Sequence, residues 1–500
     1  MSFMKTLVAA IENHGSSVAV VEQDQRFTYR ELDRESAAIA AGLRSQGVGT
    51  GDIVGVFATR SWRRCTAVLG AWRAGAGVLS LDPTMPPARI ERILRGAVPA
   101  VLVHEHPSTE LDTHIPQRTW EDLRKAPADH RLVEGEVAYA IATSGSTGTP
   151  KTVVVPWVTL ADLGRWHLDH WRHEDLPHTL HSASIGFDVI YEDMVATWLA
   201  GAELVMVSES ERRDPFALVD LVNFHRTARL FSPVGSLHSL AMVAEALPAK
   251  LPTLREIAVA GERLVINEEV RAFCRTSGIE LVNQYGPSET HVVTQYRLDG
   301  DPVRWPDHPP IGHAVVGAEL LCLDQGQLRP FRQSETAELV VAGDCVGLGY
   351  LGDEVLTAER FRTLEHRDGR SLRCYITGDQ VSFDGTDFHF VGRLDDQLKV
   401  NGYRVEPGEV EAAILSVAGV RRAAVVGIKS NGGLSLAAYY TQEPETRVSA
   451  TDIRRACSSL LPSHMVPASV NEIEQFPLTP NGKIDKKALL AMPTTPRTQS

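Results

Sequence analysis

The chain has 500 residues, of which 43% are hydrophobic and 23% charged, and its formal net charge is −13. A chain of this length exceeds what one hydrophobic core usually serves, so we expect two or more domains. The composition is that of an ordinary globular protein, and the negative charge disfavours binding to nucleic acid or to an anionic membrane surface.

The first residues do not predict a targeting signal. The apolar run after Lys5 stops at Glu12, short of the roughly 7–15 apolar residues of a signal peptide, so an amphipathic helix is the better interpretation. No stretch approaches the roughly 20 apolar residues that span a bilayer. Six scattered cysteines without a C-x-x-C pair favour reduced, mostly buried thiols and offer no zinc site. We therefore expect a cytoplasmic protein.

Short β-branched runs alternate with helical patterns through the first two-thirds of the chain. Strand-like runs occupy residues 53–57, 78–82, 100–105, 203–207 and 256–261, with helix-like segments at 30–47 and 65–75. This alternation predicts crossover units and mainly parallel sheet. After about residue 310, shorter strands and more turns predict a more antiparallel section.

A strand-turn-strand-helix pattern begins near Gly392 and has its own apolar faces. We place a domain boundary there. The predicted fold class is therefore α/β, with a large N-terminal domain over residues 1–391 that holds parallel-rich sheets and a β section. A small, mobile α+β domain is predicted over residues 392–500.

Residues 142–152, ATSGSTGTPKT, lie between two strand-like runs and combine glycines, hydroxyl residues and one lysine. Glycines let backbone amides point at an anion, and Ser and Thr hydroxyls add donors. Lys151 would supply a positive charge for phosphate oxygens. The order is not that of a Walker A loop, because Pro150 stands where that motif needs glycine. By residue type alone, a phosphate site and a solvated polar turn both stay open.

This loop resembles the phosphate-binding signature of adenylate-forming enzymes, and further signatures of that family follow in order. They are FTYREL (27–32), WRAGAGVLSLDP (72–83), FDVIYEDM (187–194), NQYGPSET (283–290), ITGD (376–379), GRLDDQLKVNGYRVEPGEVE (392–411), LPSHMVP (461–467) and PLTPNGKIDKKAL (477–489). With this ordered set, the chain resembles a stand-alone adenylation domain of nonribosomal peptide synthetases, within the acyl-CoA synthetase and luciferase superfamily.

The resemblance implies that a carboxylic acid attacks the α-phosphorus of ATP and releases pyrophosphate, so the site must bring two anions together. In the family, Tyr285 stacks on adenine and Asp379 accepts the ribose hydroxyls with Arg393 nearby. Taken singly, Tyr285 could be a core aromatic and Asp379 could cap a turn. The implied ATP-binding set is Thr143, Ser144, Gly145, Ser146, Thr147, Gly148, Lys151, Tyr285, Gly286, Ser288, Asp379 and Arg393.

Three residues are implied to be catalytic. Glu289 would help hold Mg²⁺, a hard cation that takes oxygen ligands and substrate phosphates. Lys483 would bridge the substrate carboxylate, ribose and α-phosphate, although N-G-K also suits an exposed hairpin turn. Asp395 would be the hinge about which the small domain rotates after adenylation, and Lys399 would then face the site for thioester transfer.

In amino-acid-activating members, the aspartate of the F-D motif pairs with the substrate amine, and here that residue is Asp188. The other implied pocket residues are Val189, Glu192, Leu230, Ala258, Ala260, Gln284, Val292 and Val293. This set is similar to proline-type pockets of the family and departs from them at Glu192, Ala258 and Gln284. Either Glu192 joins Asp188 to receive a second cationic group, or it turns away and pairs with the protein.

We therefore expect ATP-dependent, AMP-forming activation of an amino acid, with L-proline or a proline-like imino acid as the first choice. A basic amino acid is the second choice. The expected cofactors are ATP and Mg²⁺, and the expected partner is a separate carrier protein whose phosphopantetheine arm receives the amino acid. A coenzyme A ligase for a small acid and a non-catalytic nucleotide-binding relative are the alternatives.

Three local features qualify the resemblance. SNGGLSLAAYY (430–440) contains G-G-x-S-L, as carrier proteins do around their phosphopantetheine serine, but strand-like flanks favour a hairpin turn. Thr152 stands where the family has glycine. Gly347 and Leu348 stand where it usually has Ala and Arg. None of these departures removes a residue with an implied chemical role.

Overall fold

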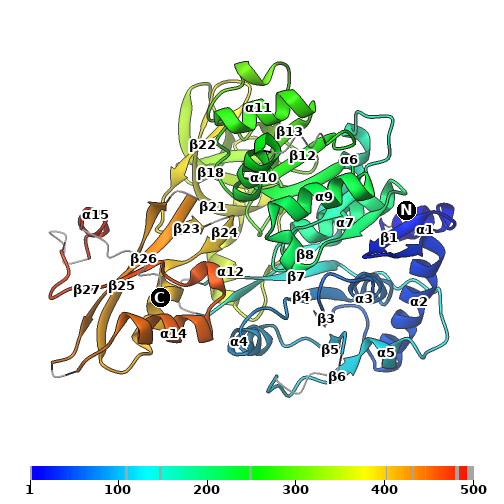
Figure 1. The fold of residues 1–500 in the computed structure, drawn as a ribbon, viewed down its shortest axis with the longest axis horizontal. Helices are drawn as coiled ribbons and strands as arrows, with labels where there is room; N and C mark the ends of the chain where they lie inside the picture. The colour runs from blue at the N-terminus through cyan, green and yellow to red at the C-terminus, as the bar shows by residue number, and fades with distance from the viewer. Residues whose placement is uncertain are drawn as a thin grey trace.

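The computed structural model of the chain describes residues 3–106, 111–145, 149–246, 251–400, 402–430, 433–444, 446–478 and 484–492. A large N-terminal body of sheets and helices carries a smaller C-terminal part on one side, at the left of Figure 1. The molecule is mixed α/β, with a large N-terminal part rich in parallel strands and a smaller C-terminal part, as the sequence predicts.

The first sheet carries the glycine-rich loop between two neighbouring strands, β7 and β8. Its strand order is β19-β8-β7-β4-β3-β5-β6, parallel from β7 to β6 and antiparallel at β8 and β19. Its short β-branched runs are almost wholly buried in the central strands, as a sheet covered on both faces requires. The strands are β3 (Ile53–Phe57), β4 (Gly77–Leu81), β5 (Val101–His104), β6 (Gln117–Thr119), β7 (Val137–Thr143), β8 (Lys151–Pro156) and β19 (Gly349–Tyr350).

The second sheet brings several pocket residues to one edge. Its order is β15-β14-β13-β12-β11-β9-β10-β1-β2, with a parallel centre and antiparallel strands at both edges. Parallel strands present their carboxyl ends at the same edge, where open α/β sheets bind ligands. The strands are β1 (Val18–Glu22), β2 (Gln25–Thr28), β9 (Thr179–His181), β10 (Leu204–Met206), β11 (Arg229–Pro233), β12 (Glu256–Ala260), β13 (Glu280–Tyr285), β14 (Thr294–Leu298) and β15 (His313–Ala314).

Helices cover both sheets, and two of them share one core with strands of each. Helices α6 and α7 pack against each other, and their buried faces join an apolar cluster that includes residues of β7, β8 and β10. The helices of this body are α1 (Phe3–Asn13), α2 (Tyr29–Ser45), α3 (Trp62–Arg73), α4 (Pro87–Ala97), α5 (Trp120–Leu123), α6 (Trp157–His170), α7 (Val189–Leu199), α8 (Glu209–Arg212), α9 (Pro215–His225), α10 (Val234–Ala246) and α11 (Glu268–Ser277).

The third sheet is antiparallel and supplies the ribose-motif residues. Its order is β17-β16-β18-β21-β20, and β22 pairs with β21, which brings Asp379 opposite Arg393. The elements here are η1 (Pro302–Arg304), β16 (Glu319–Asp324), β17 (Gln327–Pro330), β18 (Glu335–Ala342), α12 (Glu354–Arg360), β20 (Phe361–Glu365), β21 (Ser371–Phe383) and β22 (Phe388–Arg393).

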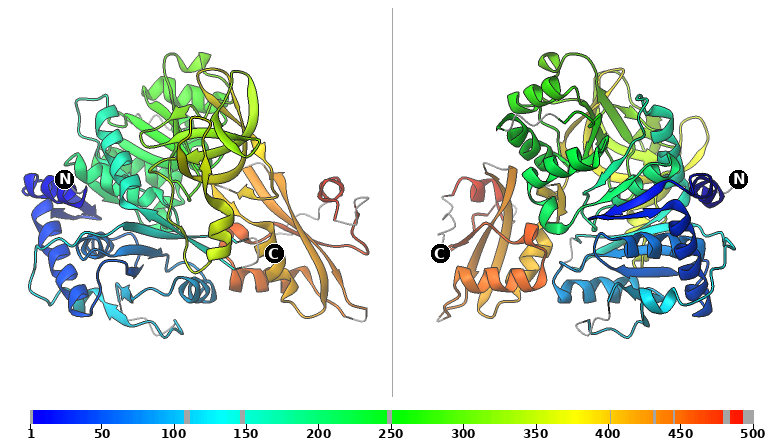
Figure 2. Two further views of the ribbon diagram at one scale, coloured as in Figure 1. Left: turned by 180° about the vertical axis from the view of Figure 1, so that it is seen from behind. Right: turned by 45° about the vertical axis from the view of Figure 1, so that its right-hand side comes forward.

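The C-terminal part has its own apolar core. Two buried clusters draw all their members from residues 398–492, and the views of Figure 2 show this part projecting beside the larger body. Its elements are β23 (Leu398–Val400), β24 (Tyr403–Val405), α13 (Pro407–Leu415), β25 (Val420–Ser430), β26 (Gly433–Gln442), α14 (Ala450–Leu460), η2 (Ser463–Met465), β27 (Ser469–Glu472) and α15 (Lys486–Leu490). These clusters agree with a boundary near Gly392, which remains a prediction.

The strands and helices expected from the sequence are confirmed with shifts of a few residues at their ends. The first helix is amphipathic and buries Phe3, Leu7 and Ile11 among others. The flanks of the G-G-x-S-L segment are the paired strands β25 and β26, and its Asn431 and Gly432 lie outside the described residues. All six cysteines are buried and unbridged. No helix within the described ranges is long and apolar enough to cross a membrane.

Candidate functional site

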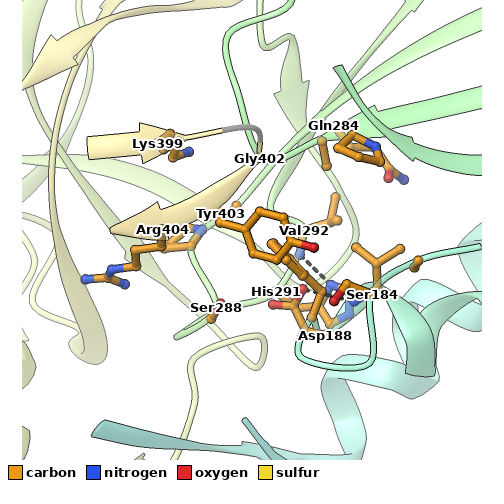
Figure 3. A pocket seen from close by; sticks show the side chains of 18 of the residues that line it. Ser184, Asp188, Gln284, Ser288, His291, Val292, Lys399, Gly402, Tyr403 and Arg404 are labelled. Atoms are coloured by element: carbon orange, nitrogen blue, oxygen red, sulfur yellow. Dashed lines mark hydrogen bonds between the residues drawn. The ribbon is translucent and has the colours of Figure 1, made fainter. Parts of the chain in front are cut away.

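A pocket lies where the second sheet, the third sheet and the hairpin β23–β24 meet. Its lining includes Asp188 at the start of α7, Gln284 on β13, Asp379 on β21 and Lys399 on the hairpin. Figure 3 shows the hairpin over the pocket, with Tyr403 extending from it toward Asp188 and Ser184. Residues from four distant segments of the chain therefore meet in one cavity.

The described ends of the glycine-rich loop face the acidic residue of the NQYGPSET motif. Thr143 ends β7 and Lys151 begins β8, where the two residues pair across the ladder. Lys151 Nζ lies 3.4 Å from Glu289 Oε1 and over the ring of Tyr350 at 4.8 Å. Burial lowers the pKa of Lys151. Ser146, Thr147 and Gly148 lie outside the described residues.

Glu289 is fully buried and surrounded by donors. Its carboxylate accepts a hydrogen bond from the Tyr350 hydroxyl at 2.7 Å and two from Arg404 Nη1, at 2.9 and 3.0 Å. Burial alone would raise the pKa of Glu289, but the positive charges of Arg404 and Lys151 hold it well below its usual value. The carboxylate is therefore ionised, and Arg404 of the hairpin is the first of the groups that compensate it, followed by Lys151 and Tyr350.

The ribose-motif residues form a second polar cluster beside Tyr285. The Tyr285 hydroxyl donates to Asp379 Oδ2 at 2.5 Å, and Arg393 donates to the other oxygen of Asp379. Arg393 also donates to both carboxylate oxygens of Asp395, at 2.6 and 2.7 Å. Burial raises the pKa of Tyr285, and the neighbouring Asp379 adds to the effect. The expected hinge residue Asp395 is thus tied to the predicted ribose site through one arginine.

Asp188 caps helix α7 and lines the pocket. Its Oδ1 accepts the Val189 amide at 3.0 Å, and the side chain is only partly buried. Around it the wall is largely apolar, formed by Val189, Phe231, Ala258, Ala260 and Val292. Leu230 and Val293, also expected in the wall, are instead buried in the two large apolar clusters.

Glu192 lies one helical turn after Asp188, beneath the lining. Its Oε1 accepts from His167 Nε2 at 2.7 Å and from Gln284 Nε2 at 3.3 Å. His291 adds a nearby imidazole, with Nδ1 3.8 Å from Glu192 Oε2. Burial alone would raise the pKa of Glu192, but these neighbours, His167 first, hold it below its usual value. Of the two options left open by the sequence, pairing with the protein is the one found.

The hairpin reaches the site through several contacts besides Arg404. Ser144 Oγ donates to the Arg404 carbonyl at 2.9 Å, and the Gly402 amide donates to Glu262. The Lys399 amine lies 5.8 Å from the Tyr285 ring centre, and burial lowers its pKa. The structure thus has Lys399 facing the site, the orientation expected for thioester transfer.

The ring of Tyr403 packs between the two parts of the chain. It stacks on His464 at 3.8 Å between ring centres and meets Phe187 edge-on at 4.8 Å. Farther from the pocket, Arg89 of α4 and Glu409 of α13 form a buried ion pair. These contacts join the C-terminal part to the larger body at the hairpin and beside it.

Lys483 lies outside the described residues. Its described neighbour Ile484 packs in the outer apolar cluster of the C-terminal part, and α15 follows at the far left of Figure 1. Lys486 pairs with Asp396 at 3.1 Å. The predicted catalytic role of Lys483 therefore stays a prediction.

Sequence reasoning did not single out His167, His291, Tyr350 or Arg404, which lie beside the carboxylates of Glu192 and Glu289. Arg404 and His291 lie within or next to quoted motifs, so their positions could have been singled out. His167 and Tyr350 lie far along the chain from Glu192 and Glu289, and only packing brings them close. Thr152 is buried within β8, where its backbone pairs with Ala142, and nothing in the structure explains the change from glycine.

The residues present suit a hard divalent cation bound mainly by substrate. Within the described residues, no group of three or more His, Cys, Asp or Glu side chains could hold a metal ion. Glu289 nevertheless offers a buried carboxylate whose present partners are three donors. Mg²⁺ keeps few protein ligands and takes phosphate and water oxygens for the rest, so a single carboxylate fits it.

Comparison with known families supports the motif assignments at the level of the family. The family model described as AMP-binding enzyme matches residues 7–351, and the model of the AMP-binding enzyme C-terminal domain matches residues 409–483. Gramicidin S synthase 2 of Brevibacillus brevis is 34% identical over 493 residues, which is 96% of this chain and 11% of that protein. The chain thus spans about a tenth of the length of that curated relative.

Solved structures share the fold over nearly the whole chain. NpsA-ThdA, an artificially fused adenylation–PCP di-domain from Klebsiella oxytoca, is 22% identical with a TM-score of 0.82, covering 94% of this chain and 93% of its own. The o-succinylbenzoate CoA synthetase of Bacillus subtilis is 19% identical with a TM-score of 0.83, covering 98% of each chain. At these identities the likeness shows the fold alone.

Proposed function

The chain belongs to the AMP-binding enzyme family, and we propose that it is an AMP-forming ligase that activates an amino acid. The amino acid is then transferred as a thioester to the phosphopantetheine arm of a carrier protein. The observation that carries the proposal is that a partly buried Asp188 and Arg404 line one pocket, and that Arg404 pairs with Glu289 of the neighbouring Lys151–Glu289 cluster. An ammonium group fits Asp188, and the phosphates of ATP fit the cluster.

In the first half-reaction, a substrate carboxylate oxygen attacks the α-phosphorus of ATP. The bond from that phosphorus to the bridging oxygen breaks, and pyrophosphate leaves with the electron pair. Lys151 contributes positive charge, and the amides of the glycine-rich loop contribute donors, where phosphate charge accumulates. Tyr285 and the Asp379–Arg393 pair orient the nucleoside.

Glu289 holds the metal in this proposal. Mg²⁺, when bound, would neutralise phosphate charge and orient the pyrophosphate leaving group. In the hairpin position observed here, the Glu289 carboxylate is already compensated by Arg404, so metal binding requires that Arg404 move away. Lys483 is proposed to enter the site in that alternative arrangement.

In the second half-reaction, the thiol sulfur of the carrier arm attacks the acyl carbon of the adenylate. The bond from that carbon to the phosphate oxygen breaks, and AMP leaves. The observed hairpin position, with Lys399 and Arg404 in the site, suits this step, because cationic groups there stabilise the departing phosphate. Asp395 is proposed as the hinge between the two arrangements.

For the side chain of the substrate, we favour proline or a proline-like imino acid. The pocket wall near Asp188 is formed by small and apolar side chains, and the second acid nearby, Glu192, is already paired inside the protein. A ring without charge needs no further polar partner there. The buried, unbridged cysteines agree with a reducing compartment, and a cytoplasmic location stays part of the proposal.

The test is amino-acid-dependent exchange of labelled pyrophosphate into ATP across a panel of amino acids and small acids. We expect exchange with proline or a cyclic relative, and at least about tenfold less with Asp188→Asn because the ammonium then loses its charged partner. A matched control is Asp122→Asn, an exposed helix-start aspartate remote from the pocket. Exchange with no amino acid but with an aryl or fatty acid would support a coenzyme A ligase instead. No exchange with any acid would leave a nucleotide-binding relative.

A further inference from the structure

The carboxylate of Glu192 lies under the amino-acid pocket, and its strongest partner comes from outside the pocket. Glu192 is 1% exposed and His167 is 4% exposed. The two side chains come from α7 and α6, which pack against each other. Their 2.7 Å contact joins His167 Nε2 to Glu192 Oε1. A buried carboxylate is costly unless it is paired, so this contact decides the charge beneath the pocket.

The other neighbours of Glu192 cannot replace His167. Gln284 donates to the same oxygen, but at 3.3 Å and without charge. His291 Nδ1 accepts the Val292 amide at 2.8 Å and lies 3.8 Å from Glu192 Oε2, beyond hydrogen-bond distance. Glu192 Oε2 has no hydrogen-bond partner among the described residues. Of these neighbours, His167 is therefore the closest hydrogen-bond partner of the carboxylate.

The pair also borders the wall that a substrate side chain would touch. The His167 ring meets Phe231 edge-on at 5.4 Å between ring centres, and Phe231 lines the pocket. Gln284, the second donor to Glu192, lines the pocket too. A change in the charge of this pair is thus felt by a side chain bound between Asp188 and the wall, through low-dielectric surroundings.

We propose that His167 sets the charge selectivity of the amino-acid pocket by pairing with Glu192, so that uncharged side chains are accepted and cationic ones are rejected. With His167 in place, the Glu192 carboxylate already has a partner on the side away from the pocket. Its attraction for a cationic substrate side chain is then too weak to offset the hydration that the cation loses on binding. Without His167, Glu192 attracts an ammonium group from the pocket. The inference rests on the proposed amino-acid activation and names a positioning residue for it.

The main test compares the kcat/KM for ornithine with that for proline, both from pyrophosphate exchange. In His167→Phe, which keeps a ring and removes the donor, the ornithine-to-proline ratio should rise at least about tenfold, mainly through a lower KM for ornithine. His170→Phe is the matched control, since His170 lies on the same helix, is exposed, and hydrogen-bonds the Trp166 carbonyl rather than any pocket residue. Its ratio should equal that of the wild type. A merely structural defect would lower the kcat/KM for both substrates together and leave their ratio unchanged.

Two further variants complete the test. The double variant His167→Phe/Glu192→Gln should return to the wild-type ratio, because the charge that attracts ornithine is gone. A raised ratio in the double variant, or an unchanged ratio in folded His167→Phe, would overturn the inference. If His167→Phe does not fold, the single variant Glu192→Gln decides. We expect its ornithine-to-proline ratio to equal that of the wild type. If the wild type prefers ornithine and Glu192→Gln abolishes that preference, the inference is overturned. Absence of exchange with every amino acid in the wild type would instead refute the proposed function.

Discussion

Two buried glutamates, Glu192 and Glu289, serve the same region of the molecule but obtain their compensating charge in different ways. Glu192 is paired by His167 and Gln284, all within the N-terminal body. Glu289 is paired by Lys151 from that body and, at shorter distance, by Arg404 from the hairpin of the C-terminal part. Both have a pKa below the usual value for a glutamate.

The difference separates a fixed charge from a conditional one. The contacts of Glu192 do not involve the hairpin, so they would persist in the proposed alternative arrangement and suit a role in selecting the substrate. The contacts of Glu289 would change if Arg404 left, and its carboxylate would then be available to another cation. A buried charge that loses its partner strongly destabilises the protein. If Arg404 leaves, another cation must therefore take its place beside Glu289. Under the proposed function, Mg²⁺ and the phosphates of ATP provide it.

The largest expected effect follows from removing the conditional charge. In Glu289→Gln, pyrophosphate exchange should fall by about 10²–10³-fold, the cost of losing one preorganised electrostatic partner of a transition state. The control is Glu209→Gln, another arginine-paired glutamate, whose pKa Arg212 and Arg60 lower to about 2 despite partial burial. It lies outside the assigned machinery. Exchange by Glu289→Gln within tenfold of the wild type would contradict a role for Glu289 in adenylation.

The second effect separates the two half-reactions. Arg404→Ala removes the partner of Glu289 only when the hairpin is in the site, so the thioester step should slow by at least about tenfold, given a cost of about 3–5 kcal/mol for breaking a buried pair. Pyrophosphate exchange should stay within about threefold, because Arg404 has no assigned contact in that step. Exchange and carrier loading, the latter followed by mass spectrometry, give the two rates. Equal losses in both would show that Arg404 is not specific to the hairpin-in state.

A smaller effect concerns pH and the packing of Tyr403. Burial, with Arg89 and Arg212 nearby, lowers the pKa of His464 to about 3, whereas a released, exposed imidazole titrates near 6.5. Between these values the released state binds more protons, so the packed arrangement loses stability as the pH falls from about 6.5 toward 3. Fluorescence energy transfer between labels on the two parts should therefore decrease on acidification from pH 7 to pH 5. His464→Phe should flatten the profile, and an unchanged profile in that variant would assign the effect to other groups.

The sequence predicted much of this arrangement because short motifs carry both an element and a site residue. The run VVV after Lys151 became β8, and the hinge motif became β23, β24 and α13 as a strand-turn-strand-helix unit. Asp379 and Arg393 lie 14 residues apart, and the antiparallel pairing of two adjacent strands brings them together. Local patterns of this kind need no knowledge of distant packing.

The pairing of each glutamate could not be predicted from the sequence. The contact between His167 and Glu192 depends on how α6 packs on α7, across 25 residues of chain. The contact between Arg404 and Glu289 spans 115 residues and depends on where the hairpin lies. The family resemblance also implied Leu230 and Val293 in the pocket wall, whereas their side chains are buried in the large apolar clusters.

The contrast between the fixed and the conditional glutamate is tested most directly by hydrogen–deuterium exchange of the hairpin amides. The Gly402 amide donates to Glu262 of the larger body while the hairpin is in the site, whereas the pairs of β23 and β24 are internal to the hairpin. Adding Mg²⁺ with a non-hydrolysable ATP analogue should speed exchange of the Gly402 amide, because the hairpin must leave Glu262 when Arg404 leaves Glu289. Peptides covering α6 and α7 should be unaffected or more protected. Unchanged or slower exchange of the hairpin would contradict the account, since Glu289 would then hold Arg404 and the metal-nucleotide together.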